Sequence, residues 1–314
     1  MVAVILAAGE GTRMKSDLPK VLHKVGGRPM LGHVLETVLS LGINEIVVVT
    51  GYKSEMVGEY VGPRAKTVLQ EKPSGTADAV LRAKSKLEGY EGDILVLYGD
   101  TPLLRKETLE KLLARHRESG ASCSLLTITL KDPTGYGRIV RSDKGGITRI
   151  VEEKDASIYE KVIEEINVGV YCFKSKGLFD SIDKICSEKK QGEYYLTDVI
   201  EILSKKNLKI ESVSTDDQTE VLGVNSPQDM AFAQRIIKDR IFDRLVNHGV
   251  VVMDRDTTYI ELDAKIGKGT TVSPFVFIES GSSIGENCQI GPFSHIKCGT
   301  VVKDNTVLRS KNIR

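Results

Sequence analysis

A glycine-rich segment near the N-terminus has the residue types and spacing that suit phosphate chemistry. The apolar run Val2–Leu6 precedes Gly9 and Gly11, and the same segment then supplies Arg13 and Lys20. Glycines allow a tight turn whose backbone N–H groups can approach phosphate oxygens, and the two cations add fixed positive charge. The segment therefore predicts an anion site, and two cations suit a triphosphate better than a dinucleotide.

The spacing excludes two common phosphate-binding motifs. A dinucleotide motif, Gly-x-Gly-x-x-Gly, would need glycine where Met14 stands, and the Gly-Lys-Ser/Thr of a P-loop is missing from this segment. An ordinary structural turn remains an alternative for the Gly-x-Gly pattern taken alone.

Asp100 directly follows an apolar run, Ile94–Leu97, through Tyr98 and Gly99. A carboxylate at the end of a buried strand beside a phosphate loop suits Mg²⁺, which prefers oxygen ligands and bridges to substrate phosphates. From these residues alone, capping of the next helix is an equal alternative for Asp100.

A third polar segment contains Gln70 and, after a turn, Gly75 and Thr76. A side-chain amide followed by backbone donors at a helix start can read the edge of a pyrimidine. An ordinary loop with Thr76 or Ser74 as N-cap is the alternative.

The elements that must position these residues alternate between strand and helix. This rhythm predicts a Rossmann-like α/β domain with a mixed, mostly parallel sheet and ligands at the carboxyl ends of its strands. The expected order is strand Val2–Leu6, helix Met30–Leu41, strand Glu45–Thr50, helix Thr76–Leu87 and strand Asp93–Leu97. A β-rich block at 122–130, a hairpin over 139–152 and a helix over 227–247 follow.

Aliphatic residues recur every six positions near the C-terminus, with a small residue two places before each. This period predicts a parallel β-helix whose aliphatic side chains fill a narrow core. The aliphatic positions are Ile260, Ile266, Val272, Ile278, Ile284, Ile290, Ile296, Val302 and Leu308.

The chain resembles the sugar-phosphate nucleotidyltransferases, through the string Leu-x-x-Gly-x-Gly-Thr-Arg-x₅-Pro-Lys that ends at Lys20. Its further strings Val151–Ala156 and Glu165–Gly169 resemble bacterial N-acetylglucosamine-1-phosphate uridylyltransferases, which also carry an acetyltransferase β-helix. The resemblance implies a left-handed β-helix with three hexads per turn that commonly forms trimers. Glu153 departs from the histidine often seen at its position in that family.

The resemblance assigns roles residue by residue. Arg13 and Lys20 would be the catalytic cations on the triphosphate, and Asp100 and Asn225 would bind Mg²⁺. The nucleotide would contact Leu6, Ala7, Ala8, Gly9, Gly11, Gln70, Gly75 and Thr76. The sugar would contact Tyr98, Gly137, Glu152 and Asn167.

Length and charge are consistent with an enzyme acting on small molecules. The chain has 314 residues, and its 44 basic and 43 acidic residues give no electrostatic reason to expect nucleic acid or a membrane as partner. The apolar start lacks the features of a signal peptide, which predicts a cytoplasmic protein. We expect a nucleotidyltransferase domain at 1–225, a connecting helix at 226–247 and a β-helix at 248–314.

The leading hypothesis is an enzyme that makes UDP-N-acetylglucosamine and pyrophosphate from UTP and N-acetylglucosamine 1-phosphate, with Mg²⁺ as cofactor and as a homotrimer. We expect no acetyltransferase activity from this chain, and we interpret His295 as a surface or subunit-contact residue. One alternative is a uridylyl- or thymidylyltransferase for another sugar 1-phosphate, such as glucose 1-phosphate. An alternative of another class is a non-catalytic regulatory or assembly subunit.

Overall fold

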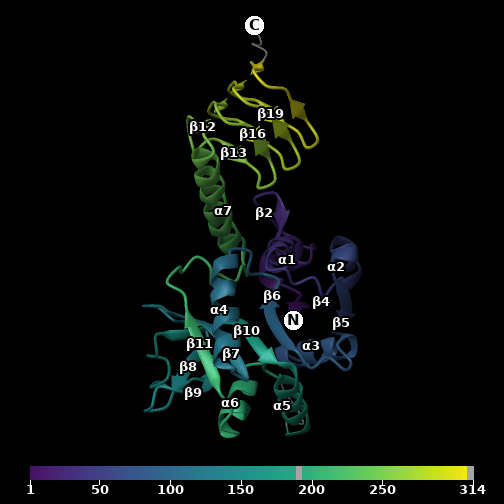
Figure 1. The fold of residues 1–314 in the computed structure, drawn as a ribbon, viewed down its shortest axis with the longest axis vertical. Helices are drawn as coiled ribbons and strands as arrows, with labels where there is room; N and C mark the ends of the chain where they lie inside the picture. The colour runs from purple at the N-terminus through teal and green to yellow at the C-terminus, as the bar shows by residue number, and fades with distance from the viewer. Residues whose placement is uncertain (189–192, 310–314) are drawn as a thin grey trace. The chain divides into compact units, whose positions relative to one another are not determined.

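A computed structural model describes residues 1–188 and 193–309 and divides the chain into two compact units. The first comprises Met1–Leu22 and Met30–Asn225, and the second comprises His23–Pro29 and Ser226–Arg314. The two units are described separately below, and Figure 1 gives the labels of their elements. No helix among the described residues is long and apolar enough to span a membrane.

The first unit is built on a mixed nine-stranded sheet, which confirms the predicted fold class. Strand β1 lies parallel between β4 and β6, whereas β10 runs antiparallel to β6 and β7. The order across the sheet is β11 (Ile210–Ser214), β7 (Cys123–Thr129), β10 (Glu165–Lys174), β6 (Asp93–Tyr98), β1 (Val2–Ala7), β4 (Ile46–Thr50) and β5 (Lys66–Leu69). The predicted hairpin forms as β8 (Arg138–Arg141) and β9 (Ile147–Val151), with β8 pairing onto β10.

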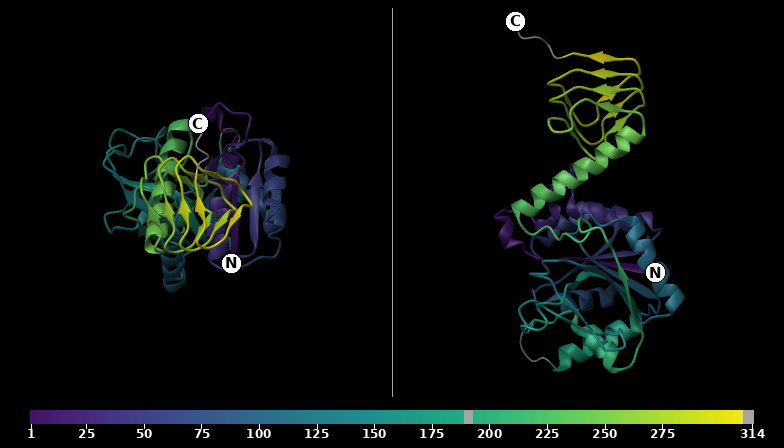
Figure 2. Two further views of the ribbon diagram at one scale, coloured as in Figure 1. Left: turned by 90° about the horizontal axis from the view of Figure 1, so that it is seen from above. Right: turned by 90° about the vertical axis from the view of Figure 1, so that its left-hand side faces the viewer.

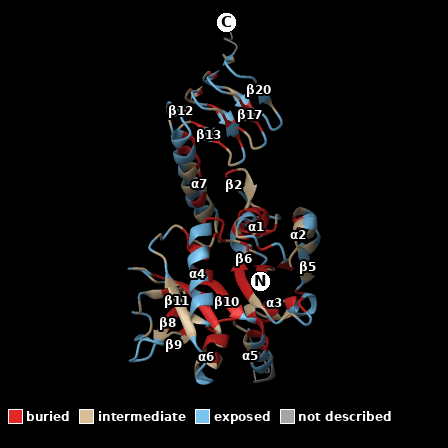
Figure 3. Cartoon of the chain, in the orientation of Figure 1, coloured by how far each residue is buried: buried red, intermediate tan, exposed pale blue. Residues whose placement is uncertain are grey.

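Helices cover both faces of this sheet. Alternate residues of β1 enter opposite cores: Val4 packs with one set of helices and Ile5 with the other, so the strand is buried throughout. Figure 3 shows buried residues concentrated on the central strands of the sheet, such as β6. The Val4 side is covered by α3 (Thr76–Ala83), α5 (Ser175–Glu188) and α6 (Asp198–Lys205). The Ile5 side is covered by α1 (Met30–Ser40), α2 (Ser54–Val61) and α4 (Lys106–Ser119). Short 3₁₀ turns form at Thr12–Met14, Lys20–Leu22, Gly62–Arg64 and Lys84–Lys86, the last ending the helix predicted to reach Leu87.

In the second unit, helix α7 (Pro227–Asn247) has the predicted bounds and begins with a capping box between Ser226 and Asp229. A small hairpin from the N-terminal part of the chain, β2 (Lys24–Val25) and β3 (Arg28–Pro29), packs onto α7. The backbone N–H of Gly26 donates to Gln234 Oε1 at 2.8 Å, and an added Cβ at Gly26 would lie 2.5 Å from Ile237. Glycine is therefore required where the hairpin touches the helix.

The hexad array folds as two-residue parallel strands in three sheets. Figure 2 shows its coils stacked on one another. Residues 18 apart pair, so that Tyr259 lies beside Phe277 and Phe277 beside His295, which corresponds to three hexads per turn. The strands are β12 (Val251–Val252), β13 (Tyr259–Ile260), β14 (Lys265–Ile266), β15 (Thr271–Val272), β16 (Phe277–Ile278), β17 (Ser283–Ile284), β18 (Gln289–Ile290), β19 (His295–Ile296), β20 (Val301–Val302) and β21 (Val307–Leu308). The second residue of each strand from β13 to β20 is buried, which confirms the predicted core positions up to Val302.

Candidate active site

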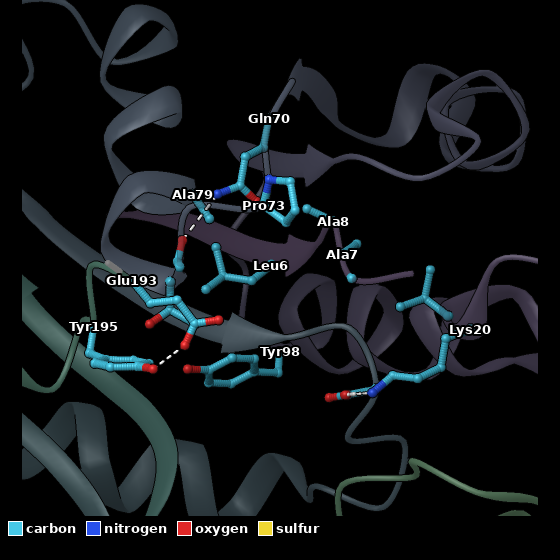
Figure 4. Close-up of a pocket in the computed structure, with 15 residues that line it drawn as sticks. Leu6, Ala7, Ala8, Lys20, Gln70, Pro73, Ala79, Tyr98, Glu193 and Tyr195 are labelled. Atoms are coloured by element: carbon cyan, nitrogen blue, oxygen red, sulfur yellow. Dashed lines mark hydrogen bonds and ion pairs between the residues drawn. The ribbon is translucent and has the colours of Figure 1, made fainter. Parts of the chain in front are cut away.

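The carboxyl ends of β1 and β6 lie side by side and open onto a cavity of about 290 Å³. Seven of the eight predicted nucleotide-site residues line it: Leu6, Ala7, Ala8, Gly9, Gln70, Gly75 and Thr76. The predicted catalytic residue Lys20, the predicted sugar-site residue Tyr98 and the predicted metal ligand Asp100 line it as well, and Figure 4 shows the side chains of the cavity. Val21, Pro73, Ala79, Glu193 and Tyr195 complete the lining and were not predicted. The Gly99 N–H donates to the Leu6 carbonyl at 2.9 Å, which fixes the aspartate loop beside the glycine loop.

Two cations and two oxygen-bearing side chains meet at one edge of this cavity. Lys20 Nζ forms an ion pair with the Asp100 carboxylate and donates to Asn225 Oδ1 at 2.8 Å. Arg13 donates to the same Asn225 oxygen at 2.9 Å. Asn225 donates its own amide to the Gly223 carbonyl at 2.9 Å, so the orientation that presents Oδ1 to the cations is fixed.

Gly11 allows this lysine to lie where it does. The residue has φ +70°, and an added Cβ would stand 2.5 Å from Lys20 Cβ. Any side chain at position 11 would therefore push the lysine stem away from Asp100.

The residues around Lys20 fit a divalent cation. Asp100 and Asn225 direct oxygen atoms to one point, and the lysine ammonium lies against both of them, so the local field already favours positive charge. Within residues 1–188 and 193–309, no group of three or more His, Cys, Asp or Glu side chains is arranged to hold a metal. A metal here would complete its coordination with water and phosphate oxygens, as Mg²⁺ commonly does.

Gln70 is buried at the opposite end of the cavity, and its amide group is held by two internal acceptors. Its Nε2 donates to Asp78 Oδ2 at 2.8 Å and to the Gly75 carbonyl at 3.0 Å. Both amide hydrogens are thereby used, so the carbonyl oxygen is the part of the side chain that can face a ligand. We expected Gln70 to offer a ligand both a hydrogen-bond donor and an acceptor, but in this conformation it can offer only an acceptor.

Gly75 and Thr76 are fixed against the segment that precedes α6. Gly75 has φ +104°, and an added Cβ would lie 2.4 Å from the Tyr194 carbonyl oxygen. The Leu196 N–H donates to Thr76 Oγ1 at 2.9 Å, and the Ala77 N–H donates to the Tyr194 carbonyl at 2.8 Å. The start of α3 and the 194–196 segment therefore form one wall.

The three other predicted sugar-site residues, Gly137, Glu152 and Asn167, converge on one another away from the lining of the main cavity. The Asn167 N–H donates to the Gly137 carbonyl at 2.8 Å. An added Cβ at Gly137 would lie 3.5 Å from Glu152 Oε2 and 3.7 Å from Asn167 Cβ. Glu152 also lines an adjoining polar hollow, which shares Tyr195 with the main cavity.

Glu152 is held by Thr197, whose hydroxyl donates to its Oε1 at 2.8 Å. Burial raises the pKa of Glu152, and the nearby carboxylates Asp198 and Asp155 raise it further, against the opposing effect of the Thr197 hydrogen bond. Glu152 therefore takes up a proton more readily than an exposed glutamate as the pH falls.

Asn167 is held by a buried tyrosine and by a bulge in β10. Its Nδ2 donates to the Tyr171 hydroxyl at 2.6 Å, and its Oδ1 accepts from the Gly169 N–H at 3.1 Å. Gly169 has φ +84°, and the Tyr98 ring packs where a Cβ would stand. Burial raises the pKa of both Tyr98 and Tyr171, so these hydroxyls stay protonated.

Sequence reasoning missed the residues that orient the site. Thr197 and Tyr171 contact Glu152 and Asn167, respectively, and Glu193 accepts from the Tyr195 hydroxyl at the cavity wall (Figure 4). Thr197 lies 45 positions from Glu152, so no spacing pattern marks this pair. Tyr171 lies four positions from Asn167, and Glu193 lies two positions from Tyr195, and neither spacing is typical of a known motif.

The sequence of the chain matches two protein families. Residues 2–220 match Nucleotidyl transferase, and residues 263–298 match Bacterial transferase hexapeptide (six repeats). The chain belongs to the nucleotidyl transferase family.

Curated relatives are similar over most of the chain. "Bifunctional protein GlmU" from Pelotomaculum thermopropionicum is 46% identical over 275 residues, which cover 88% of this chain and 60% of the relative. The protein of the same name from Halalkalibacterium halodurans is 47% identical over 272 residues, covering 87% and 60%. The chain thus spans about 60% of the length of these relatives.

A crystal structure from Bacillus anthracis, provisionally assigned as a glucose-1-phosphate thymidylyltransferase, is similar in fold. Its TM-score is 0.62 at 19% identity, over 75% of this chain and 95% of that one. At this identity the likeness supports the fold of the nucleotidyl transferase domain.

Proposed function

We propose that the chain transfers UMP from UTP to N-acetylglucosamine 1-phosphate, giving UDP-N-acetylglucosamine and pyrophosphate, with Mg²⁺ as its metal. The observation that carries this proposal is the meeting of Lys20, Arg13, Asp100 and Asn225 at the mouth of the glycine loop. The similarity to the GlmU proteins supports the choice of nucleotide and sugar.

In the proposed reaction, an oxygen of the sugar phosphate attacks the α-phosphorus of UTP, and the bond from that phosphorus to the bridging oxygen of pyrophosphate breaks. Lys20, Arg13 and the glycine-loop amides would stabilise the charge that develops on the leaving pyrophosphate. Asp100 and Asn225 would hold Mg²⁺, which neutralises phosphate charge and aligns the two substrates. A phosphate oxygen is already a nucleophile, so the side chains need only orient and stabilise the reactants.

One part of the site would recognise the uracil base and the other part would recognise the sugar. The Gln70 carbonyl oxygen can accept the N3–H of uracil, which cytosine lacks. Glu152 and Asn167 would receive the sugar hydroxyls and acetamido group beside Gly137. We further propose that the β-helix assembles the chain as a homotrimer.

The test is a matrix of nucleoside triphosphates against sugar 1-phosphates, scored by pyrophosphate release. We expect the highest kcat/KM for UTP with N-acetylglucosamine 1-phosphate. A preference for ATP or GTP would contradict the role of Gln70, and faster reaction of glucose 1-phosphate would contradict the roles of Glu152 and Asn167. Asp100→Ala is expected to be nearly inactive even at saturating Mg²⁺.

A further inference from the structure

We propose that Glu153, paired with Arg138, is a positioning residue that holds the turn 135–138 in place for the sugar. The inference rests on the proposed function, because it concerns how the same site recognises its sugar phosphate. Glu153 directly follows the proposed sugar ligand Glu152, yet its side chain contacts different residues.

The Glu153 carboxylate joins both ends of the turn. Its Oε2 accepts from Arg138 at 2.7 Å and from the Gly135 backbone N–H at 3.1 Å. The Arg138 guanidinium in turn donates to the Tyr136 carbonyl, inside the turn. One carboxylate and one guanidinium therefore fix Gly135 and Tyr136, which precede β8, to Arg138, the first residue of that strand.

The Arg138–Glu153 ion pair is partly buried, because the arginine lies inside the protein. The Arg138 side chain is only 2% exposed, whereas that of Glu153 is 31% exposed. Guanidinium stays charged in proteins, so a buried arginine needs a nearby anion. Arg138 and the Gly135 N–H lower the pKa of Glu153, so the carboxylate stays ionised at neutral pH.

The turn presents Gly137 at the point where the proposed sugar ligands converge. The Gly137 carbonyl is bonded to the Asn167 N–H, and the space of the missing Cβ faces Ile150 at 3.0 Å and Glu152 at 3.5 Å. A small displacement of the turn would move Gly137 relative to both Glu152 and Asn167. Such a displacement affects the sugar half of the site and leaves the triphosphate contacts of Lys20 and Arg13 in place.

Glu153→Asp tests the proposal, because it keeps the charge and shortens the side chain by one methylene group. The KM for N-acetylglucosamine 1-phosphate is expected to rise about tenfold, since small misplacements of binding groups are costly. The KM for UTP should stay within about twofold of wild type. Glu153→Gln keeps the length of the side chain and removes its charge. It should also raise the KM for N-acetylglucosamine 1-phosphate and leave the KM for UTP nearly unchanged. Hydrogen exchange of the 135–137 amides should be faster in both variants.

A matched control lies on the same strand. Arg141 on β8 forms two hydrogen bonds of 2.7 Å to the Glu165 carboxylate on β10, so Glu165→Asp shortens the carboxylate of another arginine–glutamate ion pair made by β8. This variant should leave the KM for the sugar phosphate unchanged even if it lowers the thermal midpoint of unfolding.

The outcomes separate this proposal from the proposed function. Equal changes in both KM values, or no change in either in Glu153→Asp and Glu153→Gln, would overturn the positioning role. If the wild-type protein instead turns over another substrate pair in the matrix, the proposed function fails, and the same KM ratio measured with that pair still decides the role of Glu153.

Discussion

In the proposed reaction, Lys20 would contact either the two proposed metal ligands or the triphosphate. In the structure its ammonium lies against Asp100 and Asn225, the two oxygen ligands proposed for Mg²⁺. A divalent cation bound to Asp100 and Asn225 would repel the Lys20 ammonium, which would then pair with the triphosphate. The lysine would therefore compete with free metal but bind together with the metal–nucleotide complex.

Lys20→Met is expected to tighten binding of Mn²⁺ measured without nucleotide, because the competing ammonium is gone. The same variant should lose about 100-fold or more in kcat/KM, as charge on the leaving pyrophosphate is no longer stabilised. Free Mn²⁺ is followed by electron paramagnetic resonance and activity by pyrophosphate release. Lys15→Met, an exposed lysine on the same loop, serves as control and should change neither. Unchanged Mn²⁺ binding in Lys20→Met would contradict the competition.

The pKa of Glu152 gives the sugar half of the site a pH dependence. In the proposed function the carboxylate form of Glu152 would accept sugar hydroxyls, and burial together with Asp198 and Asp155 raises the pKa of this group. As the pH falls through this raised pKa, the carboxylate is lost and the KM for the sugar phosphate should rise. Asp198→Asn removes one raising charge, so the rise should begin at lower pH in that variant. An identical pH profile of sugar-phosphate KM in both proteins would show that Glu152 does not control it.

At the scale of elements, the sequence predicted those strands and helices whose own residues carry a clear apolar pattern or cap. Strands β1, β4 and β6 are continuous apolar runs, and α7 carries its own capping box, so their bounds follow from sequence. β10 was recognised only as a binding string, because Gly169 interrupts it at a bulge. The half-buried strand β11 and the charged helix α4 gave weak apolar periodicity.

Contacts distant in sequence account for what the sequence did not predict. The hairpin 24–29 depends on Gln234, and the orientation of Glu152 depends on Thr197, 45 positions later. The sugar-binding roles of Gly137, Glu152 and Asn167 came from the family resemblance, and these roles stay predictions. The structure adds that the three lie together.

The packing of α4 against β7 contains a buried histidine that links stability to pH. His116 Nδ1 lies 2.9 Å from Ser124 Oγ, and Nε2 lies 3.5 Å from Asp93 Oδ1. Burial lowers the pKa of His116 below its model-compound value of 6.5, against the opposing effect of Asp93. As the pH falls below 6.5, the unfolded chain therefore binds a proton that the folded chain does not, and stability decreases.

We expect the thermal midpoint of unfolding to fall more steeply in wild type than in His116→Gln between about pH 7 and pH 5. Glutamine can hydrogen bond to Ser124 but does not titrate. A wild-type slope that is unchanged in His116→Gln would exclude this histidine as the cause.

At the scale of the whole molecule, the hexads supply a regular core and also an exposed aromatic surface. On the sheet formed by β13, β16 and β19, Tyr259, Phe277 and His295 occupy the same position in successive turns, and the Phe277 and His295 rings meet edge to face with centroids 5.2 Å apart. Beside them, Phe275 and Phe293 stack at 5.1 Å. Exposed apolar patches of this kind mark interaction sites, which agrees with the proposed assembly through the β-helix.

The expected mass by analytical ultracentrifugation is three times the 34.5 kDa of the chain. Phe277→Glu combined with Phe293→Glu places charge in the aromatic surface and should shift the protein towards monomer, because burial of an unpaired charge in an interface is costly. Phe232→Glu is the matched control, since Phe232 on α7 is 39% exposed and Phe277 is 38% exposed. A monomeric wild type would contradict the trimer. A trimer that persists in the double variant would show that a face other than β13–β16–β19 forms the contact, since two new carboxylates per subunit could not be buried there without partners.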